Sequence, residues 1–299
     1  MHPHRHSHTT YAFNRAFAVG IALNLSFVVA EAVAGWFSGS LALLADAGHN
    51  LSDVAGLALA WVAALAAGRR PDARHTYGWR RASILASFAN AVLLLVAMGS
   101  LLWEALHRLQ APPPADAATV MLVGAIGMLI NGATAALFMP GMKADMNLRG
   151  AFLHMAADAL VSLGVVLAGF LYLRTGWAWV DPAASMVIAL LIVAGTWRLF
   201  RQSLHLLFDG VPEGVALAEV DRLLRGLPGV VDVHDLHVWA MGTTETALTA
   251  HLVTPGGHPG DAFLDRVGRQ LHDRFHITHT TLQIELDGHD HGCELHAGP

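Results

Sequence analysis

Two histidines and two aspartates recur at one spacing in otherwise apolar sequence. The stretch ADAGHNLSDVAGL contains His49 and Asp53, and the stretch LRGAFLHMAADALVSLG contains His154 and Asp158. A separation of four residues places both side chains of each pair on one face of a helix, one turn apart. Two such helices that face each other would bring four nitrogen and oxygen donors together.

The chemistry that suits these four donors is the binding of a divalent transition metal. Two neutral imidazoles and two carboxylates match the ligand number of tetrahedral Zn²⁺, and the two negative charges balance the charge of the ion. Mg²⁺ and Ca²⁺ prefer shells of oxygen only, so the histidines argue against them. Two other interpretations stay open, namely hydrogen-bonded pairs that only join helices, and a proton relay without metal.

The elements that would position these donors are membrane-spanning helices. The chain has 299 residues, is 54% hydrophobic and only 14% charged, and has a mean hydropathy of +0.47, which is atypical of a soluble globular protein. A bilayer core requires about 20 apolar residues per helix. Six segments qualify: 11–37, 41–67, 80–106, 117–140, 149–173 and 179–204.

Basic residues gather at alternate ends of these six segments. They are Arg69, Arg70, Arg74, Arg80, Arg81, Lys143, Arg149, Arg198 and Arg201. The positive-inside rule places these ends, and therefore both chain termini, in the cytoplasm. The alanine- and glycine-rich composition suggests a bacterial inner (plasma) membrane. No basic run with interleaved aromatic residues is present, so nucleic acid is not an expected partner.

The chain is expected to contain four regions: a histidine-rich cytoplasmic tail at 1–10, a transmembrane domain at 11–208, a cytoplasmic α+β domain at 209–287, and a tail at 288–299 that contains histidines and Cys293. Within the α+β domain we expect a helix at 213–227, strands at 230–240 and 244–254, a helix that starts with Asp261 as its N-cap, and a strand at 280–286. Each tail is either a solvated end or a binding segment for soft divalent metals.

Other polar residues also lie in the apolar segments. Asp46 precedes His49 by almost one turn, so it could orient an imidazole, line the entrance to the site, or make a simple polar contact. Glu31 stands alone in the first segment and is a candidate proton carrier. Three asparagines, Asn24, Asn90 and Asn131, are expected to form hydrogen bonds between helices.

Several separated motifs together resemble the cation diffusion facilitator family, close to its zinc transporters. They are LLADAGHNLSDVAGL, RHTYGWRRASILASFANAVLLL, NLRGAFLHMAADALVSLGVVLAG, WVDPAASMVIALLIV and VHDLHVWAM. The resemblance covers about residues 11–287. It implies a homodimer in which each chain has six transmembrane helices and a ferredoxin-like, metallochaperone-like cytoplasmic domain. It also implies export of Zn²⁺ from the cytoplasm in exchange for H⁺ by alternating access, without enzymatic activity.

The resemblance assigns roles to individual residues. The transport site maps to His49 and Asp53 in the second segment and to His154 and Asp158 in the fifth. A histidine at position 49 is similar to the zinc-preferring branch, while Cd²⁺, Co²⁺ and Fe²⁺ remain possible further substrates. Zn²⁺ is thus expected as the transported substrate and as a structural or regulatory ligand.

Three further residues, His234, His251 and Glu285, resemble the ligands of the family's cytoplasmic zinc sites. Side chains alternate between the two faces of a strand, and His251 and Glu285 fall on the face opposite to the apolar residues of their strands. They therefore do not belong to the hydrophobic core. Three ligands leave a fourth position, which a histidine from either tail could fill.

Two other correspondences involve loop residues. Asp72 and His75 match two ligands of a loop metal site found in some members, but Trp79 stands where a third histidine would be. Asp72 and His75 could equally be ordinary loop residues. The family's charge interlock between the third span and the soluble domain maps to Arg81 and Asp209, and these two charges could also simply be solvated.

Two other classes of function compete with transport. An intramembrane metalloenzyme is disfavoured because the sequence lacks an H-E-x-x-H motif, and because four protein ligands leave no position for a catalytic water on zinc. A membrane metal sensor would need an output domain, and none is recognisable after residue 287.

Overall fold

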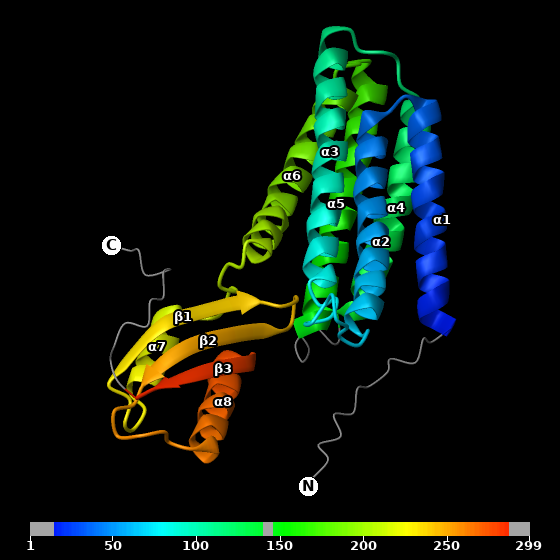
Figure 1. Ribbon diagram of the computed structural model, residues 1–299. Coiled ribbons are helices and arrows are strands. Elements are labelled where there is room, and N and C mark those ends of the chain that lie inside the picture. The colour runs from blue at the N-terminus through cyan, green and yellow to red at the C-terminus, as the bar shows by residue number, and fades with distance from the viewer. Residues whose placement is uncertain (1–14, 140–145, 287–299) are drawn as a thin grey trace. The chain divides into compact units, whose positions relative to one another are not determined.

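The structure is a computed structural model that describes residues 15–139 and 146–286 (Figure 1). The two predicted tails at 1–10 and 288–299, with Cys293, and the basic residue Lys143 lie outside these described residues. The predictions made for them remain predictions.

Long helices form the N-terminal two thirds of the described chain. Their bounds are α1 Arg15–Ser38, α2 Leu41–Ala67, α3 Ala82–Gln110, α4 Ala117–Phe138, α5 Met146–Thr175 and α6 Val180–Leu207. Five of the described helices are long and apolar enough to cross a membrane, and the apolar part of α1 that could be assessed, Leu25–Ser38, is shorter. The predicted membrane bundle of six helices is confirmed, with bounds that agree to within a few residues.

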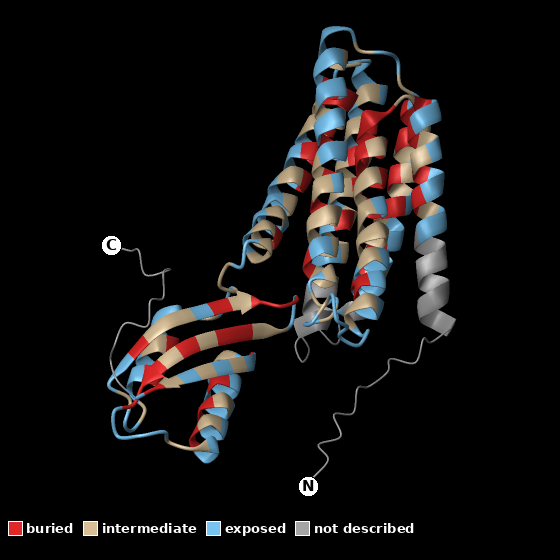
Figure 2. Ribbon diagram, viewed as in Figure 1, coloured by how far each residue is buried: buried red, intermediate tan, exposed pale blue. Residues whose placement is uncertain are grey.

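Many large apolar residues of these helices are exposed, and Figure 2 shows exposed positions along the length of the helices. Trp61, Leu93 and Val187 are all exposed, as expected for side chains that face lipid. The interior contains a mixture of small and large residues. Its buried members are Ala42, Leu43, Ala45, Leu94, Met98, Val120, Val165, Ile188, Ala189 and Ile192.

Glycines allow α4 to approach its neighbours closely. A Cβ atom added at Gly124 would lie 3.1 Å from Val166 of α5, and one added at Gly127 would lie 2.9 Å from the ring of Phe27 in α1. Helices pack through such small residues in membranes because lipid provides no hydrophobic force to press them together. The contacts fix the position of α5, which supplies half of the predicted transport site.

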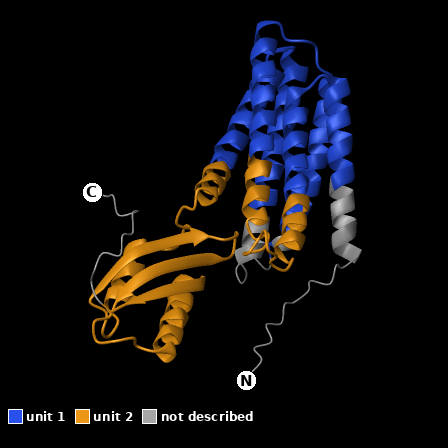
Figure 3. Cartoon of the chain, viewed as in Figure 1, with its two compact units in different colours: residues 1–57, 92–197 blue, residues 58–91, 198–299 orange. Residues whose placement is uncertain are grey.

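The chain divides into two compact units, of which one comprises residues 1–57 and 92–197 and the other comprises residues 58–91 and 198–299 (Figure 3). The second unit contains the α+β domain, with α7 Leu217–Arg225, β1 Asp232–Ala240, β2 Thr246–Val253, α8 Asp261–Phe275 and β3 Ile277–Glu285. The sheet order is β1-β2-β3; β1 and β2 are antiparallel, and β2 and β3 are parallel. The predicted order of helices and strands is confirmed.

The core of this domain lies between the two helices and one face of the sheet. Val220 and Leu224 of α7 and Val267 and Leu271 of α8 are buried there, as their helical spacing predicts. The core members contributed by the sheet are Val233, Val238, Leu248, Ala250, Leu252 and Ile277. The opposite face therefore remains available for polar side chains.

Three details differ from the sequence predictions. Helix α7 starts at Leu217 because a turn at Pro212, closed by the N–H of Val215, precedes it. Asp261 is not an N-cap: Gly260 occupies that position with φ 82°, a conformation that favours glycine. Strand β3 begins three residues earlier than predicted, because His276 ends α8 in the left-handed conformation and leads directly into the strand.

Candidate metal sites

The four predicted transport-site residues lie together in the first unit. His49 Nε2 is 3.3 Å from Asp158 Oδ1, which belongs to α5, and 3.8 Å from Asp53 Oδ2 on its own helix. His154 Nε2 is 3.2 Å from Asp53 Oδ2 and 3.7 Å from Asp158 Oδ2. Each carboxylate therefore lies between the two imidazoles, whose ring centroids are 6.1 Å apart.

These separations can be compared with those of a zinc site. Bonds of 2.0–2.1 Å in a tetrahedron place neighbouring ligand atoms about 3.3 Å apart. The contacts between helices, at 3.2 and 3.3 Å, are close to this value, whereas the contacts within each helix are slightly longer. Ligand atoms of His49, Asp53 and Asp158 all lie within 4.8 Å of one another. His154 is not part of that close group, so three donors are already spaced for one divalent cation, and His154, which lies 3.2 Å from Asp53, is placed to complete a tetrahedral set by moving closer to His49.

The four side chains differ in their access to the surroundings. The side chain of Asp158 is 3% exposed, whereas those of Asp53 and His154 are 36% and 45% exposed. Asp158 is therefore the buried end of the cluster, and Asp53 and His154 form its open side.

The polar residues around this cluster select among the alternatives predicted for them, and Asp46 makes a polar contact within the bundle. Asp46 accepts a hydrogen bond from Ser162 Oγ at 2.8 Å. Within the described residues, His49 Nδ1 has no hydrogen-bond partner, so Asp46 does not orient that imidazole. Asn131 is buried, and its side-chain nitrogen has no hydrogen-bond partner among the described residues, so the bond between helices predicted for Asn131 remains a prediction.

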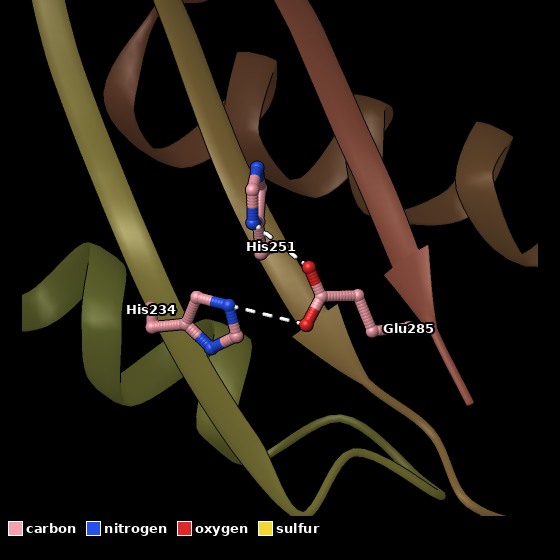
Figure 4. A group of neighbouring side chains, drawn as sticks. All are labelled: His234, His251 and Glu285. Carbon is pink, nitrogen blue, oxygen red and sulfur yellow. Dashed lines mark ion pairs between the residues drawn. The ribbon is translucent and has the colours of Figure 1, made fainter. Parts of the chain in front are cut away.

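A second cluster lies on the sheet of the α+β domain, where His234, His251 and Glu285 point toward one another (Figure 4). His234 and His251 are direct partners in the antiparallel pair of β1 and β2. The carboxylate of Glu285 extends from β3, with Oε2 3.2 Å from His234 Nε2 and Oε1 3.0 Å from His251 Nδ1. All three predicted cytoplasmic residues are thus brought together, and Glu285 is buried although it lies outside the hydrophobic core.

Asp235 also adjoins the cytoplasmic cluster, and no role was predicted for it. A β-bulge between His234 and His237 places Asp235 at φ 51°. Its Oδ2 lies 3.5 Å from His251 Nε2, and its Oδ1 lies 2.8 Å from His237 Nε2. The only hint of this contact in the sequence is that Asp235 directly follows His234. Regular strand alternation would have placed Asp235 on the face of the sheet opposite to His234.

The loop residues Asp72 and His75 are neighbours, but Asp72 closes a turn. Its Oδ1 accepts backbone hydrogen bonds from His75 and Arg74, each at 2.7 Å, and these bonds lower the pKa of its carboxyl. The ring of His75 packs against Trp79 with centroids 4.1 Å apart. Among the described residues, no third metal-ligating side chain completes a cluster with them.

The charge pair predicted between Arg81 and Asp209 is present within the second unit. A neighbouring pair joins Arg80 to Glu245, in the turn between β1 and β2. In the same turn, the N–H of Thr243 donates to Ser83 Oγ at 3.1 Å.

The described chain contains long apolar helices with a partly buried histidine–aspartate cluster, followed by an α+β domain with a histidine–glutamate cluster. These features define a multi-pass membrane protein with two candidate metal sites. Comparison with protein families makes this specific. Residues 17–208 match the cation efflux transmembrane domain, and residues 212–287 match the cation efflux protein cytoplasmic domain. The chain belongs to the cation efflux family, also called the cation diffusion facilitators.

Relatives in several bacteria match almost the full length of the chain. The metal cation efflux system protein CzcD of Cupriavidus metallidurans is 39% identical, covering 94% of this chain and 90% of its own. The zinc transporter ZitB of Escherichia coli is 36% identical, covering 99% and 96%. The cadmium, cobalt and zinc/H(+)-K(+) antiporter of Bacillus subtilis is 32% identical, covering 96% and 93%. The chain is therefore a metal cation efflux protein and not an enzyme.

Proposed function

We propose that this protein exports Zn²⁺ from the cytoplasm in exchange for H⁺, and that the ion binds between α2 and α5. The ligands are His49, Asp53, His154 and Asp158. The observation that carries the proposal is the distance from each histidine to the aspartate of the opposite helix, 3.3 and 3.2 Å, which is close to the ligand spacing of tetrahedral zinc.

Exchange with protons follows from the chemistry of the ligands. Zinc requires neutral imidazoles and ionised carboxylates, so bound metal displaces protons and incoming protons displace metal. Free histidine titrates near neutral pH, which makes His49 and His154 suitable carriers. Because the ligands come from two helices, rocking of α2 against α5 would open the cluster to each side of the membrane in turn.

Zinc is the preferred substrate in this proposal, and Cd²⁺ and Co²⁺ are further candidates. The name of the E. coli relative specifies zinc, whereas the name of the B. subtilis relative specifies cadmium, cobalt and zinc. Imidazole nitrogen suits all three ions better than it suits Mg²⁺ or Ca²⁺.

The cytoplasmic cluster is proposed as a structural or regulatory zinc site within a homodimer. His234, His251 and Glu285 supply three of the four donors that structural zinc requires. A histidine from either tail could supply the fourth, and Asp235 lies beside His251 as an outer partner. The family resemblance supports dimerisation. The arginine-rich helix ends support an inner-membrane orientation in which both termini are cytoplasmic.

The direct test is transport by the purified chain in proteoliposomes that contain a metal-sensitive dye and a pH-sensitive dye. Zn²⁺ uptake should be accompanied by proton movement in the opposite direction, and a panel of ions should rank Zn²⁺ first. His49→Ala and Asp158→Ala should abolish both signals. Asp265→Ala, which removes an exposed acid on α8, is the control and should transport normally. Full transport by either site variant would refute the proposed site, and zinc flux without proton flux would refute the exchange.

A further inference from the structure

Two carboxyl groups, those of Glu31 on α1 and Asp46 on α2, are completely buried next to each other. Each residue is 0% exposed. The amide nitrogen of Asn50 lies 3.3 Å from Glu31 Oε2 and 3.5 Å from Asp46 Oδ1, so it sits between the two acids. On the α5 side, Ser162 donates to Asp46. Neither acid belongs to the proposed set of metal ligands.

No cation in the described structure balances two charges at this position. The buried charged and polar residues there include no lysine or arginine. The groups that donate to the pair, Asn50 from α2 and Ser162 from α5, are neutral. Besides Glu31, the titratable groups that act electrostatically on Asp46 are His49 and Asp158, and Asp158 adds negative charge. Two ionised carboxylates buried side by side, with only neutral donors beside them, would be strongly destabilised.

The hydrogen bonding of the pair leads to the same conclusion. The donors beside the pair are too few for two anions: one amide nitrogen, that of Asn50, serves both acids, and Ser162 serves Asp46 alone. Ionised carboxylates only accept hydrogen bonds, so two anions here would leave most of their acceptor positions unfilled by the described residues. The second oxygen of Glu31, Oε1, is buried without a hydrogen-bond partner in the described residues, as suits a neutral acid better than an anion.

We propose that Glu31 and Asp46 share one exchangeable proton and form a proton site separate from the metal ligands. The proton is released when a divalent cation occupies the cluster of His49, Asp53, His154 and Asp158. This inference rests on the proposed metal exchange, because it assigns one of the exchanged protons to a specific place.

The coupling between the two sites is electrostatic and local. Asn50 follows His49 directly on α2, and Ser162 lies one turn after Asp158 on α5, so the residues that contact the acid pair lie beside the ligands. A doubly charged ion in the cluster favours the ionised form of nearby acids. The O–H bond of the shared proton then breaks, the proton passes to water, and the pair gains one negative charge. By reciprocity, proton return weakens metal binding.

The test counts the protons released when Zn²⁺ binds to the full-length protein, by calorimetry in buffers of different ionisation enthalpy. Glu31→Gln should still bind zinc but release about one proton fewer per protein than the wild type. Asp46→Asn should have the same deficit. The control Glu104→Gln replaces an acid that pairs with Arg108 elsewhere in the chain, and should release as many protons as the wild type. An unchanged count in both Glu31→Gln and Asp46→Asn would overturn the inference.

Infrared spectroscopy separates failure of this inference from failure of the proposed function. The metal-free wild type at neutral pH should show the C=O stretch of a protonated carboxylic acid. The band should be lost in Glu31→Gln and kept in Glu104→Gln. Absence of the band from the wild type would overturn the shared proton even if zinc is transported. If the band is present but the protein does not transport metal, the proposed exchange of Zn²⁺ for H⁺ is refuted. The acid pair would then still be a site that holds a proton.

Discussion

The protein contains two histidine–carboxylate clusters built on different scaffolds. In the membrane, the proposed ligands come from α2 and α5, and each helix contributes one histidine and one aspartate. In the cytoplasmic domain they come from three adjacent strands, which contribute His234, His251 and Glu285. The donor chemistry is similar, so differences in behaviour must arise from the scaffold and from burial.

The two scaffolds restrain their ligands to different degrees. A helix satisfies its backbone hydrogen bonds internally, so α2 and α5 can shift relative to each other without breaking any of them. The strands are joined by backbone hydrogen bonds, so the spacing of His234 and His251 is fixed by their register. A site on two helices can open and release its ion, whereas a site on one sheet holds its ion in place. This difference suits transport in one case and structural stabilisation in the other.

The largest effect is expected from the buried carboxylate of the membrane cluster. Asp158→Asn keeps the size of the side chain but removes the charge that faces both histidines. Loss of residues that merely support a ligand costs about 10–100-fold in metal affinity, so loss of this ligand should cost at least about 100-fold. Asp53→Asn should cost less, since Asp53 is on the open side of the cluster. Calorimetry on the full-length protein would measure the zinc affinity of both variants. Equal losses of affinity would show that the burial of a carboxylate does not determine how much it contributes to binding.

The next largest effect should come from the cytoplasmic cluster. Glu285→Gln removes the carboxylate that joins the two histidines, and because it is a proposed ligand the metal affinity of this site should fall by about 100-fold, the upper end of the loss seen when supporting residues are removed. Transport should fall by less than the loss in Asp158→Asn, because the membrane cluster is intact. Glu219→Gln, an exposed change in the first turn of α7, provides the control. If Glu285→Gln stopped transport as completely as Asp158→Asn, the cytoplasmic site would have to take part in the transport cycle itself.

The membrane cluster could be predicted from the sequence more directly than the cytoplasmic cluster. The His-x-x-x-Asp spacing defines a helix face, so the convergence of each membrane pair could be predicted locally, and only the facing of α2 and α5 required the fold. The cytoplasmic residues are far apart in sequence, and their grouping depended on the family resemblance. Asp235 was missed because its direction depends on a bulge that interrupts alternation.

The buried acid pair shows a similar limit. Glu31 and Asp46 were each recognised as unusual, but no periodicity relates a residue of α1 to one of α2. Their contact depends on how the helices pack, to which the glycines of α4 contribute through Phe27 and Ser162. The loop pair Asp72 and His75 illustrates the opposite error, since a spacing that resembles metal ligands is used to close a turn.

A smaller effect is expected from Asp235. Asp235→Asn should lower the affinity of the cytoplasmic site by about 10-fold or less, because an outer partner of His251 is weakened while the three main donors remain. His237→Ala tests whether the effect passes through the neighbouring imidazole, whose Nε2 lies 2.8 Å from Oδ1 of Asp235. A loss as large as that in Glu285→Gln would identify Asp235 as a direct ligand of the metal.

The smallest effect should come from the loop. Asp72→Asn should leave zinc affinity and transport within about 2-fold of the wild type, because an asparagine oxygen can still accept the backbone N–H groups of Arg74 and His75. The lowered pKa of Asp72 means that its carboxylate contributes stability above the ordinary aspartate pKa, and that this contribution is lost as the pH falls through the lowered value. At neutral pH the turn is therefore fully stabilised by the carboxylate. A marked loss of zinc binding in Asp72→Asn, measured by the same calorimetry, would add a third metal site to the comparison.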